Sequence, residues 1–157
     1  MRSDAGGFTY LELVATAAIF AILASAILPL AKVSVTRQKE LELRRALRQI
    51  RTAVDSYHAA VQQGLIGGTD NQLGSEGYPA TLEILVEGVA QVGAVDTDKK
   101  LKFLRRIPRD PFDAEGEWGL RCYQDEPDST SWCGDNVWDL YSRSDRTALD
   151  GTRYREW

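Results

Sequence analysis

The sequence predicts an α+β fold in which one long N-terminal helix packs on a small C-terminal antiparallel sheet. Three observations support this. Residues 8–31 form an apolar run that contains a single charge, Glu12. Residues 43–61 carry apolar side chains at helical spacing. Residues 119–142 contain short strand-like segments between Asp, Pro, Ser and Gly. We therefore expect a helix with a membrane-spanning half and an amphipathic half.

Charge is distributed unevenly along the 157-residue chain, whose net charge is −4. Residues 32–62 carry seven Lys and Arg against three Asp and Glu, whereas residues 63–157 carry eleven against eighteen. A basic segment therefore joins an apolar anchor to an acidic C-terminal domain. The acidic domain argues against nucleic-acid binding as the main role. The length suits one modest domain with attachments.

The apolar run over residues 8–31 has three interpretations. Its 24 residues would reach about 36 Å as a helix, enough to cross a bilayer core. It is compatible with a secretory signal cut after the small residues 24–26, although Arg2 is offset by Asp4 and the run continues past that point. It is also compatible with a plain single-span anchor that keeps Glu12 near the interface. The third interpretation is a membrane segment preceded by a short polar leader, residues 1–7.

We favour the third interpretation because of Glu12. A carboxylate in the bilayer core costs about 2.5–3.5 kcal/mol, so it is seldom there without a use. Removal of the leader after Gly7 makes Phe8 the new N-terminus, and its ammonium can pair with Glu12 of a neighbouring subunit. An unpaired buried charge is strongly unfavourable, so only subunits that add in register satisfy Glu12.

The segment that carries these residues resembles a known N-terminal signature. Gly7-Phe8-Thr9-Tyr10-Leu11-Glu12-Leu13 is similar to the start of type IV pilins and type II secretion pseudopilins. The resemblance implies that a prepilin peptidase cuts after Gly7 and N-methylates Phe8. Glu12 stands where the family has its glutamate, and Pro29 matches its helix-loosening proline. Tyr10 departs from the aliphatic residue usual at that position.

The resemblance also implies a topology: a single-pass protein of the bacterial inner membrane with its C-terminal domain in the periplasm. The positive-inside rule predicts the opposite, because basic residues follow the span and few precede it. Those that follow it are Lys32, Arg37, Lys39, Arg44, Arg45, Arg48 and Arg51.

The helix is expected to continue over residues 32–63 and to end at Gly64. A narrow apolar stripe steps by four and three residues and forms the expected contact face for the sheet. Its members are Leu43, Leu47, Ile50, Val54, Tyr57 and Val61. A short self-associating coiled coil is the alternative use of this stripe. The face that carries Arg44, Arg45, Arg48 and Arg51 is expected to be solvated or to meet the acidic domain of a neighbouring subunit.

Residues 64–157 are expected to form the globular domain. Residues 64–70 open a loop, and Thr81 is a candidate N-cap for a short helix that ends at Val86 or Gly88. The two prolines within residues 107–112 exclude a central strand there. Three short strands are predicted at Gly119–Gln124, Ser131–Cys133 and Val137–Ser142. The expected aromatic core comprises Trp118, Trp132, Trp138 and Tyr141.

This order of elements resembles the major, G-type pseudopilin of type II secretion systems. The resemblance implies a structural subunit of a helical filament that aids protein export. Its implied partners are further copies of itself, prepilin peptidase, other pseudopilins and inner-membrane secretion assembly proteins. Two other functions stay open: a type IV pilus subunit for adhesion, motility or DNA uptake, and a membrane-tethered binding module. No catalytic motif is visible in the sequence, so we do not expect an enzyme.

Two further sites are expected in the C-terminal domain. The resemblance implies a calcium site in the last loop, where Asp145 and Asp150 are candidate ligands. Two carboxylates are few for a hard cation, and aspartates that serve turns are the alternative. Cys122 and Cys133 flank predicted strands in the domain expected outside the cytoplasm, and a disulfide between them is the simplest interpretation.

Overall fold

The computed structural model describes residues 7, 9–66, 76–93 and 100–157, and it leaves the side chains of residues 26–30 undescribed. The predicted leader before Gly7, Phe8 and most of the predicted loop over residues 64–70 therefore lie outside the described residues. The chain divides into two compact units, Met1–Gln38 and Lys39–Trp157.

Helix α1 runs from Tyr10 to Gln62 and ends as the sequence predicts. Gly64 takes a left-handed backbone with φ of +67°, which glycine adopts without steric cost. Its N–H donates to the carbonyl of Val61, and the N–H of Leu65 donates to the carbonyl of Ala60. This pair of hydrogen bonds is a Schellman motif, which satisfies carbonyls that the helix end would leave unpaired.

The apolar stripe of α1 forms the centre of the unit Lys39–Trp157. Leu43, Ile50 and Val54 are completely buried, and Leu47 and Tyr57 are nearly so. Small residues between them, Ala46, Ala53 and Ala60, are buried as well. The stripe is therefore a core face against the rest of the same unit, as predicted, and the α+β class is confirmed.

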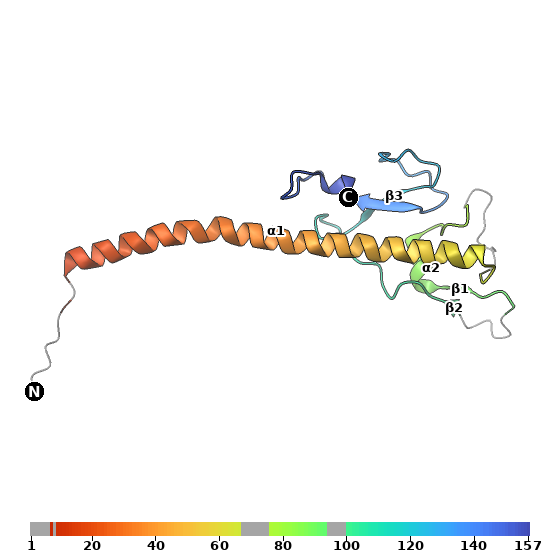
Figure 1. Ribbon diagram of the computed structural model, residues 1–157, viewed down its shortest axis with the longest axis horizontal. Coiled ribbons are helices and arrows are strands. Elements are labelled where there is room, and N and C mark those ends of the chain that lie inside the picture. The colour runs from red at the N-terminus through yellow and green to blue at the C-terminus, as the bar shows by residue number, and fades with distance from the viewer. Residues whose placement is uncertain (1–6, 8, 67–75, 94–99) are drawn as a thin grey trace, which may run out of the picture. The chain divides into compact units, whose positions relative to one another are not determined.

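Two groups of elements cover this part of α1 (Figure 1). One group holds α2 (Leu82–Glu87), β1 (Val89–Ala90) and β2 (Lys100–Leu101), and β1 and β2 pair antiparallel. The backbone N–H groups of Phe103 and Leu104 both donate to the carbonyl of Leu85, which ties the chain after β2 to α2. Thr81 is the N-cap of α2, as predicted, but its side chain makes no capping hydrogen bond.

The other group holds β3 (Trp118–Arg121), β4 (Asp139–Ser142) and the 3-10 helix η1 (Tyr154–Glu156). Strands β3 and β4 pair antiparallel, and Gly119 faces Tyr141 in their register. The Tyr141 ring lies against Gly119 so closely that a Cβ there would overlap it. Glycine at this position therefore lets the aromatic ring cover the strand.

Three details of the predicted sheet are wrong. Residues 131–133 are not a strand, and the described strands form two separate two-stranded sheets instead of one. Trp132 and Trp138 are each 38% exposed, so they are not core residues. Their expected place over the stripe is taken by Tyr154, which is 1% exposed and stacks on Phe112 with ring centroids 3.9 Å apart.

Candidate functional site

The candidate site at the start of α1 begins with a capped helix. Thr9 Oγ1 accepts a hydrogen bond of 3.3 Å from the backbone N–H of Glu12, and the Thr9 carbonyl accepts one of 3.1 Å from the N–H of Leu13. Thr9 therefore occupies the N-cap position and Glu12 the third helical position. Ser or Thr followed three residues later by Glu is a preferred helix start. The helix dipole also favours a negative charge in the first turn, so Glu12 has a local structural role of its own.

The first turns of α1 are rich in exposed apolar side chains. Every residue from 9 to 25 is exposed. The exposed fraction reaches 84% for Tyr10, 79% for Leu11 and 71% for Phe20. A contiguous apolar surface of this kind marks a region that contacts a protein partner or a membrane. Glu12 lies on this surface.

Of the other residues predicted for this site, Gly7 is exposed and Phe8 lies outside the described residues. Pro29 lies within α1, and its side chain is not described. Within the described part of the chain, no helix combines the length and the mean hydropathy that a membrane span requires.

Each of the two aspartates predicted for calcium is paired with an arginine. Asp145 Oδ1 accepts a hydrogen bond of 2.8 Å from Arg155, and Asp150 Oδ2 accepts one of 3.2 Å from Arg44. Asp150 Oδ1 also accepts hydrogen bonds from the hydroxyl and the N–H of Thr152. These Thr152 hydrogen bonds and then the nearby Arg44 lower the pKa of Asp150.

These surroundings do not fit a calcium site. Calcium takes six to eight oxygen ligands, whereas both carboxylates are already engaged by guanidinium groups. Among the described residues, neither aspartate belongs to a group of three side chains able to hold a metal ion. Asp150 instead serves the turn before Thr152, which was the alternative for these residues.

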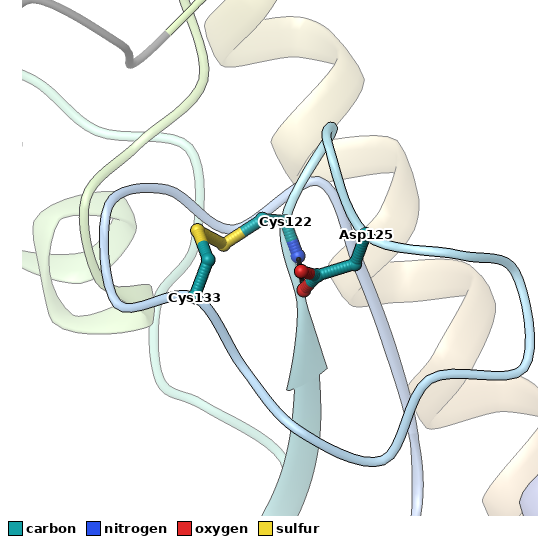
Figure 2. Close-up of side chains that lie close together, drawn as sticks. All are labelled: Cys122, Asp125 and Cys133. Carbon is teal, nitrogen blue, oxygen red and sulfur yellow. Dashed lines mark hydrogen bonds between the residues drawn. A yellow bond between two sulfur atoms is a disulfide. The ribbon is translucent and has the colours of Figure 1, made fainter.

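Cys122 and Cys133 form the predicted disulfide (Figure 2). Asp125 lies beside it, and its Oδ2 accepts a hydrogen bond of 2.7 Å from the backbone N–H of Cys122. Two thiols and a carboxylate are a metal-ligating set in principle, but sulfurs joined in a disulfide are not available as thiolates. The disulfide therefore closes the loop between the two cysteines, and the hydrogen bond from Cys122 to Asp125 stabilises the start of that loop.

Sequence analysis missed the residues that bind the C-terminal segment to α1. Arg51 was expected on a face that is solvated or meets a neighbouring subunit. It instead donates to Asp139 at 2.7 Å, to the Leu140 carbonyl at 3.1 Å and to the Trp157 carbonyl at 2.8 Å. Glu40 is buried and accepts from the Tyr154 hydroxyl. The available signal was the position of Glu40, three residues before Leu43 and hence on the side of the helix that carries the apolar stripe.

Comparison with known proteins returns no match: no family model, no curated protein and no solved structure is similar to this chain.

Proposed function

We propose that this chain is a structural subunit of a type II secretion pseudopilus, a helical filament that aids protein export. In this proposal, prepilin peptidase removes residues 1–7 and N-methylates Phe8. Before assembly the chain resides in the bacterial inner membrane as a single-pass protein, with residues 64–157 in the periplasm. Other pseudopilins and inner-membrane assembly proteins are its further partners.

The observation that carries the proposal is Glu12 on an exposed apolar helix. Residues 9–25 are exposed in the isolated chain, and a filament would bury them against the same residues of other copies. The carboxylate of Glu12 then needs a cation inside that apolar bundle, because an unpaired buried charge costs several kcal/mol. The α-ammonium of Phe8 in a neighbouring copy supplies one, so the pair selects subunits that add in register.

The first turn of α1 supports this role. Thr9 caps the helix through the N–H of Glu12, and the helix begins at Tyr10, the third residue after the proposed cleavage site. Because the first turn is helical, the Glu12 side chain projects from a helix surface and not from an irregular terminal segment. The register contact is thereby ordered in advance, which reduces the entropy that assembly costs.

Substitution of Glu12 tests the proposal. Full-length Glu12→Ala, produced together with prepilin peptidase and the secretion assembly proteins, is expected to enter the membrane fraction normally. It is expected to yield far less sheared filament than the unmodified chain. Glu87→Ala, which removes an exposed glutamate at the end of α2, is the matched control and is expected to assemble normally. Normal filament yield from Glu12→Ala would refute the register role and favour a membrane-tethered module that works as a monomer.

A further inference from the structure

Arginine side chains line a groove beside the exposed face of α1. Three clefts of about 560, 580 and 510 Å³ adjoin there. The first and second share the lining residue Arg48, the first and third share Arg45, and the second and third share Gln49. The opposite wall comes from residues 103–109, the segment that follows β2. We define the basic groove by four arginines that line these clefts: Arg45, Arg48, Arg105 and Arg106.

The charge of the basic groove is not balanced within the described part of the chain. None of its four arginines forms an ion pair there, whereas Arg44 and Arg51 on the same helix are paired with Asp150 and Asp139. Glu42 is the one acidic residue among the described residues that line the three clefts. Guanidinium groups match carboxylates in geometry, so the groove is suited to an acidic protein segment.

The same chain carries such a segment over residues 122–136, which we call the acidic loop; the disulfide closes its first part, from Cys122 to Cys133. It holds Asp125, Glu126, Asp128 and Asp135, and it has no Lys or Arg. Glu126, Asp128 and Asp135 are exposed. The disulfide and the hydrogen bond from Cys122 to Asp125 restrict the loop, so little conformational entropy is lost when it binds.

An aromatic side chain accompanies the charges of the acidic loop. Trp132 is 38% exposed, and its Nε1–H donates a hydrogen bond of 2.7 Å to the Asn136 carbonyl, which orients the indole. Trp and Arg dominate the binding energy of many protein interfaces, and a guanidinium over an indole face is a favourable contact. Trp132 thus offers an anchor that the arginines of the basic groove can cover.

We propose that the acidic loop of one copy of this chain docks in the basic groove of the next copy, an inference that rests on the proposed function. Two different surfaces of each copy meet in this contact, so it repeats head to tail and can build an open filament. A polyanion such as nucleic acid or an anionic membrane suits the contact less well, because the acidic loop and the negative net charge repel it.

Zero-length crosslinking tests this contact on the full chain. Arg105→Lys keeps the positive charge and adds an amine that a carbodiimide can join to a carboxylate in direct contact. Filaments are assembled from a mixture of light and heavy isotope-labelled subunits and are then sheared off and crosslinked. A crosslinked peptide pair that contains one light and one heavy peptide, a mixed pair, proves a contact between copies. We expect a mixed pair between position 105 and a carboxylate of the acidic loop. Arg153→Lys, an exposed site outside the groove, is the matched control and is expected to give no such pair.

Charge reversal gives a second readout. Arg48→Glu is expected to abolish the mixed pair at position 105, and adding Asp128→Arg is expected to restore it. Salt raised from about 0.1 M to about 1 M should reduce the pair, because the Debye length falls from about 10 Å to about 3 Å.

Three results would overturn the inference. Filaments whose mixed pairs at position 105 involve only other segments would refute the docking contact and leave the proposed function standing. Protection of position 105 by anionic vesicles, with no mixed pair to the loop, would assign the groove to a membrane. A chain that is neither cut after Gly7 nor assembled would refute both the inference and the proposed function.

Discussion

The hydroxyl of Tyr154 donates a hydrogen bond of 3.0 Å to Oε1 of Glu40, which lies 114 residues earlier in the chain. The same Oε1 accepts a hydrogen bond of 2.8 Å from the backbone N–H of Leu149. Tyr154 is 1% exposed and Glu40 is 9% exposed. One buried carboxylate on α1 therefore holds both the last loop and the 3-10 helix that ends the chain.

Removal of the Tyr154 hydroxyl should destabilise the protein. Tyr154→Phe keeps the ring but leaves Glu40 with a single described partner, and a hydrogen bond to a charged group contributes about 1.5–3 kcal/mol. We expect the free energy of unfolding of the full chain, from urea denaturation in detergent, to fall by about that amount. Tyr123→Phe alters a tyrosine that is 54% exposed and should change the free energy of unfolding by less than about 0.5 kcal/mol. Equal stability of both variants would show that the Glu40 contact is not stabilising.

Stability should fall at alkaline pH through the same tyrosine. Burial, followed by the hydrogen bond to Glu40 and its charge, raises the pKa of Tyr154 from 10.0 to about 12. Between these values the unfolded chain loses the phenol proton and the folded chain keeps it, so unfolding is favoured as pH rises. The contribution of Tyr154 is complete below pH 10 and is lost by pH 12.

The alkaline prediction is checked by phenolate absorbance and by unfolding. One tyrosine of the folded chain should ionise at about pH 12, and this late step should be absent from Tyr154→Phe. The loss of unfolding free energy between pH 10 and 12 should be smaller in that variant than in the unmodified chain. An unchanged late ionisation step would mean that another tyrosine is responsible for it.

The disulfide should contribute substantially to stability. It joins residues separated by 11 positions, and closing a loop of that size adds about 2.5–3 kcal/mol in the chain-entropy model. The double variant Cys122→Ser with Cys133→Ser is expected to lose that much in urea denaturation. The unmodified chain measured under reducing conditions is the natural companion and should lose a similar amount. If only one of these two experiments shows a loss of unfolding free energy, the loss comes from the serine substitutions or from the reductant and not from the missing disulfide.

Calcium should leave stability unchanged, contrary to what the family resemblance implies. The carboxylates of Asp145 and Asp150 already have guanidinium partners in Arg155 and Arg44. We expect the same melting temperature with calcium and with a chelator. A higher melting temperature in calcium that disappears in Asp150→Asn would restore the predicted site.

The helical parts of the fold were predictable because they follow from periodicity and end signals. The apolar stripe from Leu43 to Tyr57 is buried where its spacing predicts, and Gly64 ends α1. A stripe of this kind predicts which face of the helix is buried, but it does not predict which residues cover that face. Tyr154 packs in the core that covers this stripe, and its hydroxyl bonds to Glu40. A contact between residues so distant in the sequence leaves no local pattern.

The β structure was predicted less well for reasons of length. Strands β1 and β2 have two residues each, too few to show alternation. Residues 131–133 carry strand-like side chains but lie in the loop that the disulfide closes, where they pair with no described strand. At the N-terminal site, the sequence indicated Glu12 but not that Thr9 accepts its N–H, because capping depends on where the helix starts.

The most direct test of the central claim is the mass of the intact protein purified from membranes, together with the sequence of its N-terminal fragment. The account predicts a chain that starts at N-methylated Phe8, cut after Gly7. A chain that still starts at Met1 would contradict it and leave a membrane-tethered module. A chain that starts at Ile27 would contradict it in favour of a secreted protein.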